Sequence, residues 1–338
     1  MLERLKTLSE LYGVSGDETR VRKYILEQVQ PHCDEVYIDR MGNLYAHKKG
    51  NGKRVMYCAH MDEVGMIVTG VLDSGLLAFS AVGLDMRAIV SKRVAVGKND
   101  VPGIIGSKAI HLQTPEERKT VLREKDLYVD IGAKDKEDAL KYVNLGDYIS
   151  FTTKFSEFGD GLIKGKALDD RVGCAILMEL LQDSYDCDFT AVFTVMEEIG
   201  LRGAEAAVYN VKPEISIALE GTICNDMPEC PPHKSVTRLG KGAVISFMDG
   251  GTIISQSMID TLKETAVNND IPWQFRQGNS GGNDNGIIHR SLAGCKTGAI
   301  SVPCRYIHSP NSIAAKSDLD SAYRLAKAFL SEKKFNVV

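Results

Sequence analysis

Apolar residues recur at helical spacing in the first and last parts of the chain and at strand spacing between these helices. The N-terminal part predicts helices over residues 2–11 and 18–29, with Asp17 placed to cap the second helix. Short apolar runs predict strands at 35–39, 44–47 and 54–59. From residue 169 onward the predicted helices cover 172–181, 203–208, 259–268 and 319–330, and the predicted strands cover 189–196, 214–219, 273–277 and 299–304.

The segment between about residue 65 and residue 166 has a different pattern. Its strand-like runs are short, separated by glycine-containing turns, and cover 66–71, 76–82, 93–96, 104–107, 127–130 and 148–152. A polar loop or short helix is predicted at 113–125 and helical character at 133–142. Six short strands with turn signals between them predict a small β-barrel or sandwich.

Residues that bind metal ions well follow four of the predicted strands. They are His60 and Asp62 after 54–59, Glu197 and Glu198 after 189–196, Glu220 after 214–219, and His308 after 299–304. In an open α/β sheet the carboxyl ends of parallel strands face one crevice, so we expect these side chains to share one site. The pattern predicts a metallohydrolase with two metal ions.

Each of these residues also has a structural interpretation. A neutral His60 imidazole suits zinc, cobalt or a similar divalent ion, with Asp62 orienting the ring, but a lone histidine is often a structural or capping residue. Asp169 and Asp170 open a predicted helix, where carboxylates commonly act as N-caps. Alternatively, Asp169 could bridge two ions, because its carboxylate has two oxygens.

The adjacent pair Glu197-Glu198 is the strongest local signal. Neighbouring carboxylates raise each other's pKa unless a cation compensates their charge. Adjacent side chains on an extended chain face opposite ways, so Glu198 is expected to bind metal while Glu197 acts as the general base. A solvated turn is the alternative for this pair. For Glu220 and His308, a satisfied polar residue is an equally good interpretation of each one taken alone.

The candidate ligands lie on both sides of the β-rich segment and none lies within it. We therefore predict one discontinuous catalytic α/β domain, residues 1–65 and 165–338, with a β-rich domain inserted at 66–164. The length of 338 residues is consistent with two domains.

Composition excludes several classes of protein. The net charge is -4 with the two signs interspersed, so no nucleic-acid partner is expected. No apolar stretch approaches the roughly 20 residues needed to span a bilayer, and the charged N-terminus does not look like a secretory signal. None of the eight cysteines forms a C-x-x-C pair, and several lie in apolar runs. Reduced thiols in a cytoplasmic protein without a membrane partner are expected.

Four motifs together resemble the glutamyl aminopeptidase and tetrahedral aminopeptidase family, some members of which carry an endoglucanase label. The motifs are AHMDEVG at 59–65, ALDDR at 167–171, MEEIGLRGA at 196–204 and YIHSP at 306–310. Their order and spacing match the family over nearly the whole chain. The resemblance implies a cytosolic di-metal exopeptidase with a mixed-sheet α/β/α domain and an inserted, β-barrel-like domain.

The resemblance also implies a role for each site residue. His60 and Glu220 would bind one ion, Glu198 and His308 the other, and Asp169 would bridge them. Asp62 would orient His60, and Glu197 would be the catalytic base. Further implications are a cis peptide bond between residues 169 and 170, zinc, cobalt or manganese as the metal, peptides as substrates, and homo-oligomers ranging from a dimer formed through the inserted domain to a tetrahedral dodecamer.

Two departures from the family pattern affect expectations about substrate and metal. The family more often has Asp at the position of Glu220, and the segment GGNDN at 281–285 replaces a Gly-Gly-Thr-Asp-Ala stretch. Arg202, Arg276 and Arg290 could favour acidic substrates or be structural. The alternatives to an aminopeptidase are an N-deacylase with the same metal chemistry, a metal-independent glycosidase using paired carboxylates, and an inactive metal-stabilised assembly subunit.

Overall fold

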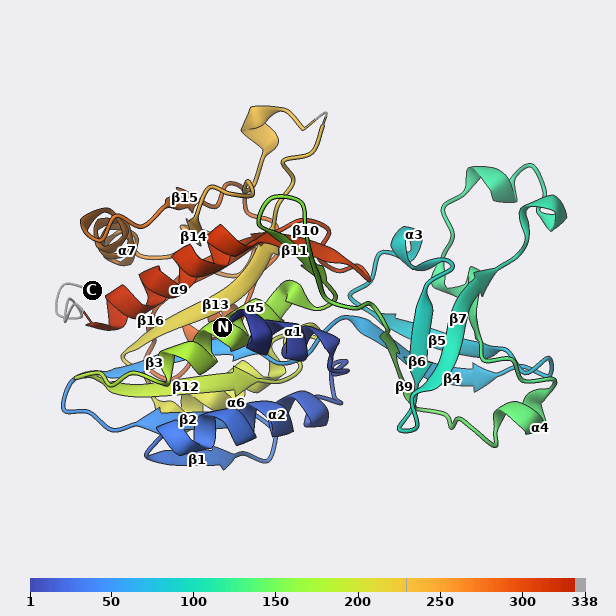
Figure 1. The fold of residues 1–338 in the computed structure, drawn as a ribbon, viewed down its shortest axis with the longest axis horizontal. Helices are drawn as coiled ribbons and strands as arrows, with labels where there is room; N and C mark the ends of the chain where they lie inside the picture. Colours follow the sequence, from blue (N-terminus) through green and yellow to red (C-terminus); the bar gives the residue numbers. More distant parts are fainter. Residues whose placement is uncertain (229, 332–338) are drawn as a thin grey trace.

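An eight-stranded mixed sheet forms the centre of the larger domain in this computed structural model, which describes residues 1–228 and 230–331 (Figure 1). The spatial order is β1-β2-β12-β3-β13-β16-β14-β15. These strands are β1 (Glu35–Ile38), β2 (Leu44–Lys48), β12 (Asp188–Thr194), β3 (Arg54–His60), β13 (Ile215–Ile223), β16 (Lys296–Cys304), β14 (Ala243–Ile245) and β15 (Trp273–Phe275). Strands β12, β3, β13 and β16 run parallel, so their carboxyl ends meet at one edge of the sheet.

Helices cover both faces of this sheet. One face packs against α1 (Leu2–Glu10), α2 (Thr19–Val29), α5 (Leu168–Leu180), α7 (Gln256–Asn268) and α9 (Lys316–Ser331) through a large apolar core. The other face packs against α6 (Arg202–Val211) and the short α8 (Asn285–Ile288). The apolar side chains of the central strands are buried on both faces, which explains why their sequences read as continuous apolar runs.

A closed barrel of six strands projects from one side of the larger domain (Figure 1). It comprises β4 (Gly65–Val71), β5 (Leu77–Val82), β8 (Leu127–Asp130), β7 (Val101–Ser107), β6 (Arg93–Val96) and β9 (Tyr148–Phe151), in that spatial order. The barrel has its own apolar core, which includes Met66, Val94 and Ile149. Two short helices, α3 (Met86–Ile89) and α4 (Lys136–Ala139), interrupt its connections. The mixed α/β fold with an inserted barrel, predicted from the sequence, is confirmed.

After the barrel, the chain returns to the larger domain as a small antiparallel sheet. β10 (Ser156–Phe158) pairs with β11 (Leu162–Gly165), which pairs with β17 (Ser312–Ala315). β17 lies just beyond the loop that carries His308, so this sheet holds the end of that loop in place.

Several local predictions need correction. The helical character expected at 133–142 is limited to α4, whereas the 113–125 segment is, as predicted, a loop with short helical turns. Asp17 does not cap α2; Glu18 occupies the N-cap position, and it makes no side-chain capping bond. The Glu18 carboxylate instead accepts hydrogen bonds from the backbone N–H groups of Gly16 and Met196. None of the helices in the described ranges has the length and apolar character required to cross a bilayer.

Candidate di-metal centre

His60, at the carboxyl end of β3, is the centre of a first group of polar side chains. Its Nε2 lies 3.6 Å from Asp169 Oδ1, 3.7 Å from Glu220 Oε2 and 4.0 Å from Glu197 Oε2. Glu220 comes from the neighbouring strand β13, and Asp169 from the start of α5. The His60 side chain is only 2% exposed, so this group is formed in the interior and not on a solvated surface.

A second group lies around His308, in the loop after β16. Its Nε2 is 3.4 Å from Glu198 Oε2 and 3.9 Å from Asp169 Oδ2. Asp169 therefore presents Oδ1 to His60 and Oδ2 to His308. The structure thus brings together all five predicted ligands and Glu197, and it places one carboxylate between the two histidine groups.

Close approach of α5 to β13 at this point depends on a glycine. A Cβ atom at Gly221, the residue after Glu220, would lie only 2.9 Å from the Asp169 Cα. Any larger residue would push the Asp169 backbone away from the histidines.

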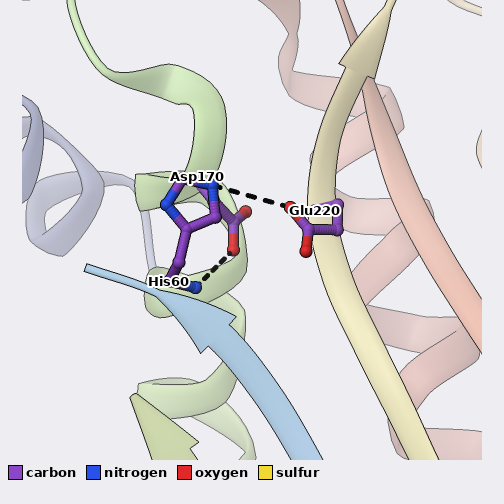
Figure 2. A group of neighbouring side chains, drawn as sticks. All are labelled: His60, Asp170 and Glu220. Atoms are coloured by element: carbon purple, nitrogen blue, oxygen red, sulfur yellow. Dashed lines mark hydrogen bonds and ion pairs between the residues drawn. The ribbon is translucent and has the colours of Figure 1, made fainter. Parts of the chain in front are cut away.

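Asp170 was not predicted as part of the site, yet it also lies beside His60 and Glu220 (Figure 2). Its Oδ2 accepts the backbone N–H of His60 at 3.1 Å, and its Oδ1 accepts that of Gly173 at 3.0 Å. The Asp169–Asp170 peptide is cis, as the family resemblance implied. Both Asp170 oxygens are engaged with backbone donors, whereas Asp169 Oδ1 has no hydrogen-bond partner within residues 1–228 and 230–331. Asp169 is therefore the better candidate ligand, and Asp170 fixes the backbone of His60.

Asp62 is fully buried and connects His60 to the acidic pair. Its backbone carbonyl accepts a hydrogen bond from His60 Nδ1 at 3.1 Å, which leaves His60 Nε2 facing the carboxylates. Its Oδ1 accepts the backbone N–H of Glu197 at 3.0 Å, and its Oδ2 accepts that of Glu198 at 3.2 Å and the hydroxyl of Ser15 at 2.6 Å. Asp62 therefore positions the backbone of Glu197 and Glu198 as well as the His60 imidazole.

Glu197 and Glu198 do not lie on an extended strand, contrary to the prediction. β12 ends at Thr194, and Met196 adopts a φ of 54°, so the acidic pair lies in a turn. The turn forms because the Asp62 carboxylate accepts both backbone N–H groups of the pair. The two side chains still diverge, since Glu197 approaches His60 and Glu198 approaches His308.

Burial and mutual repulsion dominate the electrostatics of the acidic residues. Burial raises the pKa of Glu198 to about 8 and raises the pKa values of Glu197 and Glu220 well above the usual range. Burial would also raise the pKa of Asp62, but the His60 imidazole and the Ser15 hydroxyl keep it below its usual value. Burial opposes charge on His60, yet Asp169 and Asp62 raise its pKa overall.

This arrangement fits divalent cations. Asp169 Oδ1 and Glu220 Oε1 are buried without a hydrogen-bond partner among the described residues, which is costly unless a cation or another donor satisfies them. Imidazole nitrogen with carboxylate oxygen is a donor set suited to zinc, cobalt and manganese. A group of buried like charges is also unfavourable without compensating positive charge.

A cavity of about 890 Å³ opens over these residues. Its wall includes the predicted ligands, Glu197, and residues from the loops at 246–251 and 281–283. Arg276 lines the cavity, but its guanidinium donates to Thr222 Oγ1 and to backbone carbonyls such as that of Gly278. Most of its donors are therefore used to hold the loops, which favours the structural interpretation of this arginine.

Comparison with known proteins identifies the class of enzyme to which this chain belongs. A candidate aminopeptidase of Acetivibrio thermocellus is 40% identical over 328 residues, which cover 96% of this chain and 97% of that protein. The TET aminopeptidase of a marine sediment Thaumarchaeota archaeon has a TM-score of 0.96 at 34% identity, covering 99% of this chain and 97% of that one. The Pyrococcus horikoshii TET1 peptidase, described as assembling into a tetrahedron or a large octahedral shell, has a TM-score of 0.89 at 32% identity, covering 98% of this chain and 99% of that one.

The fold and these likenesses define a metallo-aminopeptidase, a hydrolase. The M42 glutamyl aminopeptidase family matches residues 42–325, and the chain belongs to this family. The predicted family and enzyme class are thereby confirmed.

Proposed function

We propose that this enzyme removes N-terminal residues from peptides, using two divalent ions and Glu197 as the general base. One observation carries the proposal: Asp169 presents one oxygen to the His60 group and the other to the His308 group. A bridging carboxylate of this kind is useful only if two cations lie within a few ångströms of each other. A single ion or a metal-free glycosidase would not require it.

The ligand assignment follows from the two groups. His60 and Glu220 would hold one ion and Glu198 and His308 the other, with Asp169 shared. Two divalent ions held there supply Lewis-acid chemistry, which polarises a scissile carbonyl and lowers the pKa of water from about 15.7 toward 7. Zinc and cobalt suit the donor set best, and manganese is also compatible with it.

Glu197 is suited to move the proton. Its Oε2 lies 4.0 Å from His60 Nε2, farther than the oxygens of Asp169 and Glu220. The Asp62 carboxylate fixes its backbone by accepting its N–H group. Burial raises its pKa in the absence of cations, and the two proposed ions would lower it again, so that Glu197 is ionised and accepts a proton. Glu197 would take a proton from water at Oε2 and return it to the departing amine.

The decisive experiment compares substrates and variants under the same metal loading. The metal-reconstituted enzyme should release the anilide from aminoacyl-anilides and leave the N-acetylated forms intact, whereas an N-deacylase would act on the acylated compounds. Chelation should abolish turnover, and added zinc or cobalt should restore it; anilide hydrolysis that survives the chelator would contradict the role of the metal ions. Glu197→Gln should keep the bound metal and the fold but lower kcat by about 10²–10⁴-fold. Full activity of Glu197→Gln would remove Glu197 from its role.

We further infer that the inserted segment, 66–164, carries contacts between copies of the chain. Its connection between β7 and β8 holds three widely exposed apolar side chains, Ile110 at 70%, Leu112 at 63% and Val121 at 64%. A folded domain rarely exposes several such residues close in sequence unless they are covered in an assembly. Homo-oligomers from a dimer to a tetrahedral dodecamer are expected, and light scattering of the wild type and of Leu112→Ser would test this, since an unchanged mass would exclude that connection from the interface.

We also propose that the protein is located in the cytoplasm. All eight cysteines are free thiols, which is the usual state in a reducing compartment. Fractionation of cells that express the protein would test it, because recovery in an extracytoplasmic fraction would contradict it.

A further inference from the structure

A second cavity lies next to the candidate metal centre, on the side of the barrel. It has a volume of about 460 Å³ and lies between α3 with the residues that follow it and the loop after β16. Asp85, Tyr306, Ile307 and His308 line both this cavity and the larger one, so the two spaces adjoin at His308. We call the second space the barrel-side cavity.

The barrel is fixed against the metal centre at this junction. Gly83, just after β5, lies so close that a Cβ atom there would be 3.3 Å from Glu198 Oε2. The backbone N–H of Asp85 points to the carbonyl oxygen of His308 at 3.5 Å. In Figure 1, α3 lies on the side of the barrel that faces the larger domain, while α4 lies at the far end. The wall of the barrel-side cavity is therefore held next to the site of cleavage.

The two cavities differ in how their charges are compensated. In the larger cavity, the carboxylates that outnumber the basic side chains include Asp169, Glu198 and Glu220, whose charges the two proposed cations would compensate. In the barrel-side cavity the charged residues are Asp85, Arg87 and Lys92. Arg87 Nη2 is 2.6 Å from Asp85 Oδ2, and Arg87 Nε donates to both Asp85 oxygens, so these two charges compensate each other.

Lys92 remains as the uncompensated charge. It is half-buried, and its ammonium has no hydrogen bond or ion pair with any residue in the described ranges. An unpaired ammonium in the wall of a cavity favours a negatively charged ligand group. A short peptide whose scissile bond lies at the candidate metal centre has such a carboxylate at its far end, and the barrel-side cavity adjoins that centre at His308.

We propose that the barrel-side cavity binds the part of the substrate that follows the scissile bond, and that Lys92 recognises a carboxylate there. This inference rests on the proposed aminopeptidase function. The carboxylate can be the C-terminus of a di- or tripeptide or an acidic side chain after the cleaved residue. Short free-acid peptides or peptides with an acidic second residue are the substrate class that follows.

Matched substrates test the proposal. The first set consists of di- and tripeptides. Their N-terminal residue is the one that the enzyme releases fastest from aminoacyl-anilides, followed by Gly or Gly-Gly. Each peptide is made with a free C-terminal carboxylate and with a C-terminal amide. A second pair of amidated dipeptides carries Asp or Asn in the second position. The wild type should have a higher kcat/KM for the carboxylate-bearing member of a pair. Raising the salt concentration should reduce this preference, because the charges meet near the surface.

Variants assign the preference to Lys92. Lys92→Met should reduce it about threefold and Lys92→Glu about tenfold, while the amidated glycine peptides and the anilide change less than twofold. Lys136→Glu reverses an exposed charge on α4, away from the larger domain, and should leave the preference unchanged. If the variants lower kcat/KM only for the free-acid glycine peptides, Lys92 recognises the C-terminal carboxylate. If they lower it only for the Asp peptide, Lys92 recognises an acidic side chain.

The proposal is overturned if Lys92→Glu lowers acids and amides equally, or if it changes neither. These results differ from a failure of the proposed function, in which the wild type would cleave none of the free-amine substrates.

Discussion

Ser15 Oγ donates a 2.6 Å hydrogen bond to Asp62 Oδ2, although the two residues are 47 positions apart in the chain. The same Asp62 carboxylate accepts the backbone N–H groups of Glu197 and Glu198. Ser15 therefore acts on the candidate base and on one candidate ligand through a single buried carboxylate. Its hydroxyl restricts where that carboxylate can lie.

Ser15→Ala should lower kcat about tenfold and weaken metal binding, with KM nearly unchanged, because Asp62 would gain freedom to rotate away from the turn. Stability should fall by only about 1 kcal/mol, the contribution of one ordinary hydrogen bond. Steady-state kinetics and zinc titration against a chromophoric chelator measure the first two effects, and chemical denaturation measures the third.

Ser9→Ala is the matched control for this prediction. Ser9 is also buried and donates a 2.7 Å hydrogen bond, but to the carbonyl oxygen of Lys166 and not to Asp62. It should cost similar stability and leave kcat unchanged. If both variants lowered turnover equally, Ser15 would be a packing residue only.

His308→Ala should reduce the metal content from roughly two ions per chain to roughly one, because His308 approaches only the Glu198 side of Asp169. Elemental analysis after dialysis against a metal-buffered solution provides the measurement. His32→Ala, which changes an exposed histidine just after α2, should retain the full content. Two ions in the His308→Ala protein would exclude His308 from the ligand set.

The fold could largely be predicted because its strongest features are local. The central strands are continuous apolar runs, and the barrel strands are short runs between glycine turns. Elements that form only by pairing with distant segments of the chain were harder to predict. Strand β14 has only three residues, and it forms because it pairs with both β15 and β16. The helix expected near 133–142 shrinks to α4 because the chain around it packs on the barrel, where tertiary contacts override local propensity.

The candidate site could be predicted from the sequence to a similar extent. His60 ends its strand and His308 follows one, whereas Glu220, expected just after its strand, lies within β13, which continues to Ile223. Their shared position still follows from the parallel sheet. The role of Asp170 depends on which way its carboxylate turns, and nothing in the sequence marks Ser15 as a partner of Asp62. Contacts of this kind arise from the path of the N-terminal loop through space, which no local pattern encodes.

The buried ion pair between Glu63 and Lys166 leads to a prediction about stability. Lys166 Nζ lies 2.6 Å from Glu63 Oε1, and the two side chains are 1% and 2% exposed. Lys166→Met should destabilise the protein by about 3 kcal/mol, because the buried Glu63 carboxylate then keeps only the more distant Arg171 guanidinium, at 3.8 Å, as a cation. Urea denaturation near pH 7 should be used, since burial lowers the pKa of Lys166 to about 8 and Lys166 carries its charge below that value.

Two further variants separate this effect from loss of packing. Adding Glu63→Gln to Lys166→Met should recover only about 1 kcal/mol, because it removes the excess negative charge but leaves the buried Arg171 without the carboxylate 3.8 Å away. Lys154→Met removes a cation that is 75% exposed from its pair with Glu10 and should cost less than about 1 kcal/mol. No recovery in the double variant would contradict the excess charge of Glu63 as the main cause of the loss.

Asp318 provides a pH dependence that is independent of the metal centre. It lies in the first turn of α9, and its two oxygens accept the backbone N–H groups of Gly240 and Gly242, each at 2.7 Å. Burial nevertheless raises its pKa from 3.8 to about 6. The folded state thus holds the proton more tightly than the unfolded state, so this contribution to stability is complete below pH 3.8 and is lost as the pH rises through about 6.

The difference in unfolding free energy between the wild type and Asp318→Asn should therefore shift against the wild type, by at most about 3 kcal/mol, as the pH rises from about 4 to about 7. The variant loses one acceptor oxygen at every pH, so the informative quantity is the change in the difference and not its absolute value. Asp320→Asn, on the exposed side of the same helix, should give a difference that stays flat over this range. Urea titrations at several pH values would measure both differences. A flat difference for Asp318→Asn would show that the two backbone donors offset the cost of burying the charge, and that Asp318 is ionised in the folded protein throughout.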